Sequence, residues 1–243
     1  MAAAWGRWLA LVALAALCLQ LVFAARVATM TVVDPGSSTF QRSQAVRILQ
    51  ARGRLPWHQE WQPIGQMGPH LPRAVMASED AAFWTHRGLD WNALDRAWTQ
   101  QQRRSNAKVV GGSTISQQLA KNLFLSGERT MWRKGQELLI TAMMEALWSK
   151  TRLLEIYLNH VEWGEGVYGA TAASRHYFRT DPQRLTPQQA AQLAVMLPAP
   201  RRFEKNPHSA YVLGRAEVIR SRMAAVPWPQ PPEPAAPKST PRP

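Results

Sequence analysis

The chain has 243 residues, of which 46% are hydrophobic, and its 29 Lys and Arg residues against 16 Asp and Glu residues give a net charge of +13. This length allows one domain with a hydrophobic core, with or without short appendages. The single cysteine, Cys18, lies in an apolar run and excludes a disulfide framework, a cysteine-based zinc site and a cysteine nucleophile. The positive charge indicates an anionic partner: nucleic acid, an acidic membrane surface or a phosphate-bearing substrate.

Residues 8–25 form an apolar segment in which Gln20 is the only strongly polar residue. About 18 helical residues, rising ~1.5 Å each, come close to the ~30 Å hydrocarbon core of a bilayer. We therefore expect a transmembrane anchor, with residues 1–7 in the cytoplasm and the rest of the chain on the other side. The alternative is a cleavable signal peptide, because Ala24, Ala25 and Ala28 are small enough for processing, although the apolar run is longer than usual for one.

The rest of the chain has mostly helical patterns. We interpret residues 26–64 as a membrane-proximal segment with turns near 34–36 and 52–53, residues 65–226 as a single domain, and the proline-rich residues 227–243 as a disordered tail. Strand-like runs are few and short, so the predicted fold is mainly α. The spacing of apolar residues predicts helices over 71–82, 91–102, 130–150, 151–159, 167–178, 187–197 and 210–225.

The window Gly111–Asn122 has an unusual composition for a core helix. Its two glycines free the backbone, and Ser113 or Thr114 can cap a helix that begins there. A helix N-terminus with hydroxyl groups and a lysine nearby is suited to binding phosphate. The alternative is an ordinary capped surface helix. The polar residues that follow the cap are Gln117, Gln118, Lys121 and Asn122.

A second window places the carboxylates of Glu79 and Asp80 beside Phe83 and His86. A carboxylate near apolar rings has its pKa raised by desolvation, which suits a proton acceptor working near neutral pH. The alternative is a solvated acidic pair at the end of a helix.

Two further windows combine charged residues with helix or turn signals. Arg133, Lys134 and Glu137 share the early turns of one predicted helix, where Arg133 and Glu137 could also form a simple surface ion pair. Residues 160–166 contain a histidine and two glutamates, but their spacing is not that of an HExxH metal site. The glycines at 164, 166 and 169 indicate a tight turn before a packed helix.

Together and in this order, four windows resemble the motif series of the peptidoglycan glycosyltransferases, glycosyltransferase family 51. The windows are EDAAFWTHRGLD (79–90), GGSTISQQLAKN (111–122), RKGQE (133–137) and KTRLLEIYLN (150–159). The segment YLNHVEWGEGVYGATAASRHYF (157–178) resembles the monofunctional biosynthetic transglycosylases. The resemblance covers roughly residues 55–225, and we expect no transpeptidase domain after it.

The resemblance implies a lysozyme-like α fold with one N-terminal transmembrane helix in the inner (cytoplasmic) membrane and the catalytic domain on the periplasmic side. It implies a hexosyltransferase of peptidoglycan biosynthesis. A growing glycan on undecaprenyl pyrophosphate would be transferred to the GlcNAc 4-hydroxyl of lipid II, with inversion at MurNAc C1 and release of undecaprenyl pyrophosphate. A divalent cation (Mg or Mn) and no organic cofactor are expected, and the expected partners are the membrane and cell-division or elongation proteins, not nucleic acid.

The resemblance also implies roles for individual residues. Glu79 would be the general base on the acceptor hydroxyl, and Glu137 the second catalytic carboxylate, which helps to place the pyrophosphate or a bound divalent ion. A pyrophosphate leaving group needs positive charge where its negative charge develops. The expected substrate-binding residues are Asp80, Phe83, His86, Ser113, Thr114, Gln117, Gln118, Lys121, Asn122, Arg129, Arg133 and Lys134.

Three alternative functions remain at this point. A lysozyme-like hydrolase could use similar carboxylates on the same fold, but cleaving glycan needs no pyrophosphate-binding residues. A membrane-anchored scaffold that only binds nascent glycan fits poorly with two intact carboxylates, Glu79 and Glu137. A nucleic-acid-binding protein is suggested by the net charge, but the basic residues are dispersed and the expected anchor places the domain outside the cytoplasm.

Overall fold

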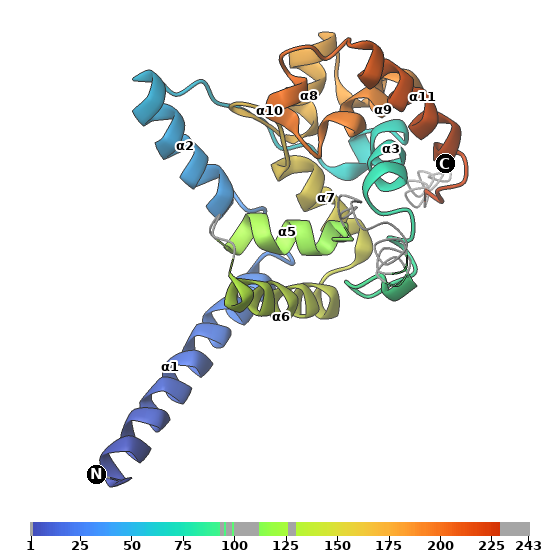
Figure 1. Ribbon diagram of the computed structural model, residues 1–243. Helices are drawn as coiled ribbons and strands as arrows, with labels where there is room; N and C mark the ends of the chain where they lie inside the picture. Colours follow the sequence, from blue (N-terminus) through green and yellow to red (C-terminus); the bar gives the residue numbers. More distant parts are fainter. Residues whose placement is uncertain (1, 93–94, 96–98, 100–111, 126–129, 229–243) are drawn as a thin grey trace, which may run out of the picture.

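The chain folds into a mainly helical body from which one long N-terminal helix projects (Figure 1). The computed structural model describes residues 2–92, 95, 99, 112–125 and 130–228. The α-helices are α1 (Ala2–Thr29), α2 (Thr39–Arg52), α3 (His70–Glu79), α5 (Ile115–Phe124), α6 (Met131–Leu147), α7 (Lys150–His160), α8 (Gly169–Phe178), α9 (Pro187–Met196), α10 (Pro200–Phe203) and α11 (Ala210–Met223). Short 3-10 helices cover Ile64–Gln66 and Pro182–Arg184.

Helices α5 and α6 pack against each other beside the end of α1, whereas α3, α9 and α11 pack together on the other side of α7 (Figure 1). The side chains of Met76 in α3, Leu193 in α9 and Val212 in α11 are at most 1% exposed in the core between these three helices. This packing holds α3 firmly, so the backbone at its C-terminal residue, Glu79, has a fixed position.

The predicted mainly-α fold class with one apolar N-terminal helix is confirmed. The stretch Ala4–Thr29 is long and apolar enough to cross a membrane, and its most apolar window is not buried in the body. Large side chains such as Trp5 and Trp8 are exposed along it. Helix α1 is therefore consistent with a single-pass membrane anchor, and it contains the segment 8–25 that the sequence indicates.

The ends of most predicted helices agree with the structure to within three residues. Helix α2 was not predicted, because residues 26–64 show turn signals and little apolar periodicity. Its start is fixed by a capping box in which the Ser38 hydroxyl accepts from the Gln41 backbone N–H at 3.1 Å, and its end by Gly53 with a φ of +65°. Of the helix predicted over 91–102, only residues 91, 92, 95 and 99 are described, and they are helical; residues 229–243 of the predicted tail lie outside the described residues.

Arg152 in α7 fixes the end of the anchor to the body. Its Nε and Nη2 donate to the carbonyl oxygen of Met30 at 3.1 and 3.0 Å, and Nη2 also donates to the carbonyl of Val33 at 3.1 Å. Its Nη1 forms ion pairs with Asp34 at 2.7 Å and Glu155 at 2.6 Å. The carbonyl groups at the C-terminus of a helix lack intrahelical donors, and a cation there is favourable.

A small sheet lies against α8, with the strand order β1-β3-β2. The strand β3 (Val167–Tyr168) runs parallel to β1 (His58–Gln59) and antiparallel to β2 (Glu162–Gly164). The turn between β2 and β3 contains Gly166 with a φ of +79°, where a Cβ atom would overlap the carbonyl oxygen of Pro56. This is the tight turn before a packed helix that the glycines at 164, 166 and 169 indicate.

We predict that Gly166→Ala lowers the thermal unfolding midpoint of the detergent-solubilised protein. The positive φ and the overlap with Pro56 together should cost on the order of 2–4 kcal/mol. The control is Gly214→Ala in α11, where a new Cβ would meet no atom within 4 Å and stability should rise by about 0.5–1 kcal/mol. An unchanged midpoint for Gly166→Ala would contradict this turn geometry.

Candidate active site

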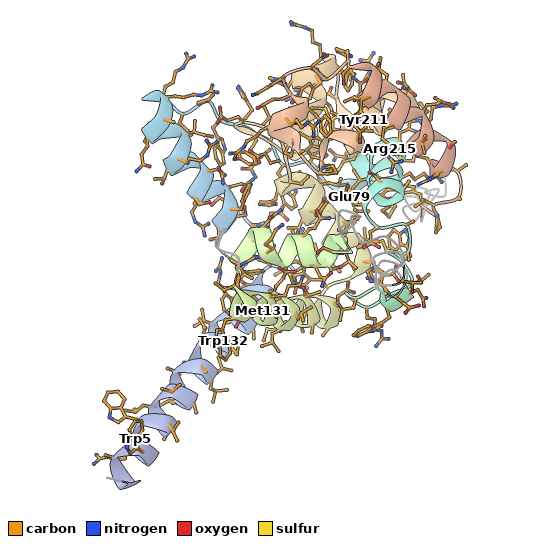
Figure 2. The ribbon with its side chains drawn as sticks, in the orientation of Figure 1. Trp5, Glu79, Met131, Trp132, Tyr211 and Arg215 are labelled. Atoms are coloured by element: carbon orange, nitrogen blue, oxygen red, sulfur yellow. The ribbon has the colours of Figure 1, made fainter. Side chains whose placement is uncertain are left out.

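Glu79 is the last residue of α3, and its half-buried carboxylate lies near α5 (Figure 2). Its Oε2 accepts a hydrogen bond from the Gln118 side-chain amide at 2.9 Å, and its Oε1 accepts a longer one from the Ser78 hydroxyl at 3.5 Å. The carboxylate is therefore held by neutral donors, and no ion pair to it is present within the described residues.

Burial raises the pKa of the Glu79 carboxyl above its usual value. The hydrogen bonds from Gln118 and Ser78 oppose this rise because they stabilise the charged form, whereas the nearby charge of Asp80 adds to it. The balance gives a carboxylate more basic than an ordinary glutamate.

A buried tyrosine fixes the amide that binds Glu79. The Tyr157 hydroxyl donates to the Gln118 Oε1 at 3.1 Å, so the Gln118 Nε2 must point toward Glu79. Tyr157 is 1% exposed, and burial raises the pKa of its hydroxyl well above the usual value, so it remains a donor at every physiological pH. Tyr157 lies in the window 150–159, but its role in the site was not predicted, because a tyrosine at a core position of a helix normally indicates packing alone.

Asp80 joins the end of α3 to the start of α5. Its Oδ2 accepts the backbone N–H of Ile115, the first residue of α5, at 3.0 Å. The His86 Nε2 lies 2.9 and 3.0 Å from its two carboxylate oxygens. The Gly88 N–H donates to the His86 Nδ1 at 3.1 Å, so Nε2 carries the proton and donates to Asp80.

The N-terminus of α5 is closed by its own side chains. Thr114 is the N-cap residue: its hydroxyl accepts the Gln117 N–H at 3.2 Å and donates to the carbonyl of Gly88 at 2.7 Å. The Gln117 Oε1 accepts the Thr114 N–H at 3.0 Å, which completes a capping box. Gly88 has a φ of +86°, and a Cβ there would lie 2.8 Å from the Thr141 Cγ2, so only glycine fits this close approach to α6.

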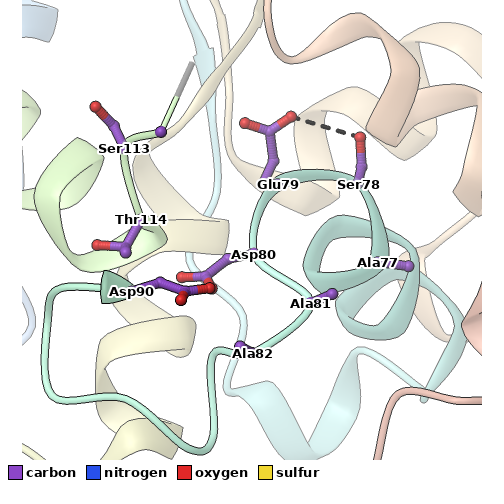
Figure 3. A pocket seen from close by; sticks show the side chains of 10 residues that line it. Ala77, Ser78, Glu79, Asp80, Ala81, Ala82, Asp90, Ser113 and Thr114 are labelled. Atoms are coloured by element: carbon purple, nitrogen blue, oxygen red, sulfur yellow. Dashed lines mark hydrogen bonds between the residues drawn. The ribbon is translucent and has the colours of Figure 1, made fainter. Parts of the chain in front are cut away.

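Glu79 lies on a wall shared by two hollows. One, of about 330 Å³, runs from Ser78 and Glu79 past Asp80 to Gly112, Ser113 and Thr114 (Figure 3). The other, of about 420 Å³, is lined by Ser78, Glu79, Ser113, Gln118, Lys121, Leu197 and Pro198. A group placed on either side of Glu79 would therefore be within reach of its carboxylate.

A second charged cluster lies in the early turns of α6. The Glu137 carboxylate is 3% exposed and accepts from the Lys134 Nζ at 2.5 Å, and the Arg133 Nη1 lies 3.8 Å from its Oε2. The Nε and Nη1 groups of Arg133 are buried and, within the described residues, have no hydrogen-bond partner. Because unpaired buried donors are unfavourable, the Arg133 guanidinium is suited to bind an anion, to which it would donate hydrogen bonds.

The structure brings Ser113, Gln118 and Lys121 to the same hollows as Glu79. Asp80, His86 and Thr114 make the contacts that hold the segment after α3 against the start of α5, and Gln117 completes the cap of α5. Phe83 is fully buried, with the Lys150 Nζ 4.7 Å from its ring centroid, and Asn122 is half-buried one residue after Lys121. Arg129 lies outside the described residues, and the predicted substrate-binding roles of all these residues stay predictions.

The described side chains do not form a metal site by themselves. No group of three or more His, Cys, Asp or Glu side chains within the described ranges could hold a metal ion. Glu137 already has a lysine and an arginine as neighbours, which disfavours a further cation there. The described residues therefore do not fit a divalent cation bound by protein ligands alone, and no step proposed below depends on one.

Comparison with known proteins agrees with this geometry. Residues 46–224 match the family model described as Transglycosylase. The chain is 48% identical over 227 residues to a biosynthetic peptidoglycan transglycosylase of Burkholderia thailandensis, which covers 92% of this chain and 88% of the relative. It is 46% identical to the corresponding protein of Paraburkholderia xenovorans, covering 92% and 94% of the two chains. The chain belongs to the peptidoglycan transglycosylases of glycosyltransferase family 51, in their monofunctional biosynthetic branch.

Proposed function

We propose that Glu79 is the general base with which this glycosyltransferase polymerises peptidoglycan strands from lipid II. The observation that carries the proposal is the environment of Glu79: a carboxylate made more basic by burial, held in one orientation by Gln118 and Tyr157, on the wall between two hollows. A hydrolase on the same fold would have no use for the cationic cluster on α6.

The base makes the acceptor reactive. Glu79 takes the proton of the GlcNAc 4-hydroxyl of lipid II as that oxygen forms its bond to C1 of MurNAc, with inversion. The bond from C1 to the pyrophosphate oxygen breaks, and its electron pair leaves with undecaprenyl pyrophosphate. Direct displacement needs no covalent nucleophile, so one ionised carboxylate at this position is sufficient.

The leaving group needs cationic residues at a second position. Arg133 and Lys134 can supply this charge, and Arg133 has buried N–H groups still available for phosphate oxygens. Glu137 is the second catalytic carboxylate in this proposal, holding Lys134 and Arg133 in place between turnovers. Ser113 and Lys121 line the hollows beside Glu79 and would contact the pyrophosphate of a donor bound there.

We further propose that α1 crosses the inner membrane and leaves the catalytic body on its periplasmic face. The length and exposure of α1 support an anchor, and the net charge of +13 is favourable beside anionic headgroups. Lipid II and the lipid-linked glycan would then lie in the same bilayer as the enzyme. Cell-division or elongation proteins are its proposed partners there.

We expect Glu79→Gln to lower polymerisation by at least about 10³-fold, since the amide cannot accept the proton. The fold should be retained, because the substitution removes the cost of burying a charge. The measurement is incubation of detergent-solubilised protein with labelled lipid II, with lysozyme-sensitive polymer read on a gel and the thermal unfolding midpoint recorded in parallel. Near-normal turnover by this variant would refute the assignment of the base.

The pH dependence of kcat/KM should report the ionisation of the Glu79 carboxyl. Activity requires ionised Glu79 and is lost as pH falls through its raised pKa, so the acid limb should lie above that of an ordinary glutamate. Gln118→Ala removes a donor to the charged form, which raises this pKa further and should move the acid limb to higher pH. Gln50→Ala, an exposed position on α2, is the control and should leave the profile unchanged. A shift to lower pH for Gln118→Ala would contradict the role of the amide.

Lys134→Met should lower kcat/KM for lipid II by about 10²-fold, because a charge facing the leaving group is lost. Arg220→Met is a matched control, since it removes one positive charge from a surface ion pair with Glu217 on α11. The two variants are compared at several ionic strengths in the same polymerisation assay. Equal small losses for both would show that Lys134 acts only through net charge.

A further inference from the structure

The membrane helix makes a directional polar contact with the catalytic body. Gln20 Nε2 donates to Gln136 Oε1 at 2.8 Å, and Gln136 Nε2 donates back to Gln20 Oε1 at 3.0 Å. Gln20 is the only strongly polar residue of the apolar run 8–25, and it lies about 14 Å before the end of α1 at ~1.5 Å per residue. A polar side chain in a membrane span is costly unless it is paired, so its presence requires an explanation.

The contact belongs to one face of α1 that meets the body. The Phe23 ring packs edge-on against Phe124 of α5, with centroids 6.0 Å apart, and the carbonyl of Val27 accepts the Trp148 indole N–H at 2.8 Å. Positions 20, 23 and 27 follow helical spacing. Helix α6 and the residue after it therefore contact the anchor at two points, Gln136 and Trp148.

Gln136 immediately precedes Glu137 and follows Arg133 and Lys134 by two to three residues. Successive side chains on a helix point about 100° apart, so turning Gln136 toward α1 also sets the direction of the charged cluster. Met131 and Trp132 at the start of α6, near α1 in Figure 2, are 86% and 91% exposed, as is common for side chains at a membrane interface.

We infer that Gln20 is a positioning residue for glycan polymerisation: its amide pair with Gln136 sets the rotation and height of α6 relative to the bilayer. This inference rests on the proposed function, in which Arg133, Lys134 and Glu137 handle a pyrophosphate whose height is fixed by its lipid. Apolar contacts such as Phe23 with Phe124 are non-directional and would tolerate sliding, whereas a reciprocal amide pair forms in one register only.

The test compares full-length wild type and Gln20→Leu in liposomes containing labelled lipid II. Leucine preserves the apolar helix, so membrane integration by alkaline extraction and the thermal midpoint should match wild type. The expected result is a kcat about 10-fold lower with a KM for lipid II within about twofold, because positioning of the leaving-group residues acts in the transition state. A lower thermal midpoint that accounts for the whole loss would overturn the inference in favour of a structural role.

Three further variants make the test specific. Cys18→Leu, at an exposed position two residues earlier, should keep the wild-type rate. Leu19→Gln with Gln20→Leu keeps the composition but turns the glutamine by about 100°, and it should remain slow. Gln20→Leu with Gln136→Leu should lose no more than either single variant, because both residues act through one contact.

A wild-type kcat for Gln20→Leu, a wild-type kcat for the shifted glutamine, or losses that multiply in the double variant would each overturn the inference. Absence of polymer from the wild type would instead refute the proposed function, so the two failures are distinguishable.

Discussion

The position of Glu79, the proposed general base, depends on the buried carboxylate of Asp80. By accepting the N–H of Ile115 it joins the last residue of α3 to the first turn of α5, and His86 holds its other side. That connection places Gln118, one turn into α5, opposite Glu79. The two adjacent carboxylates therefore have different tasks: Asp80 lies at the positive end of a helix dipole and builds the site, whereas Glu79 lies at the negative end of another and keeps its basicity.

Local signals in the sequence predicted the helices, the membrane-length segment and the windows from which the site is built. Thr114 as a helix cap and the turn around Gly166 follow from short-range chemistry, which a single chain displays. Other features depend on partners distant in sequence. In the sequence Tyr157 indicates only core packing, whereas in the structure its hydroxyl binds Gln118. Gln20 is an unexplained polar residue in an apolar run, and the structure pairs it with Gln136. Helix α2 was missed for another reason: it buries little apolar surface, so its capping box is its main signal.

The site also contains groups that lower the stability of the fold. Within the described residues, Glu79 is partly removed from water without an ion-pair partner, and Arg133 has buried donors without acceptors. Both would be poor choices for stability alone. The surrounding structure offsets these unfavourable terms, because α3 packs against α9 and α11, and α5 is capped by its own capping box. In the proposed mechanism, the substrate brings a proton to Glu79 and phosphate oxygens to Arg133, which removes both unfavourable contributions.

The contact of Arg152 with the residues that directly follow α1 has a consequence for how the enzyme would meet its substrate. Met30, Val33 and Asp34 all bind one guanidinium, so α1 is joined to the body by a hydrogen-bonded connection and not by a free linker. A free linker would let the proposed catalytic groups sample a range of distances from the membrane surface, which lowers their effective concentration at the substrate. With α1 in the membrane as proposed above, the bound connection keeps these groups at one height from the bilayer, so the search for lipid II becomes lateral diffusion in two dimensions.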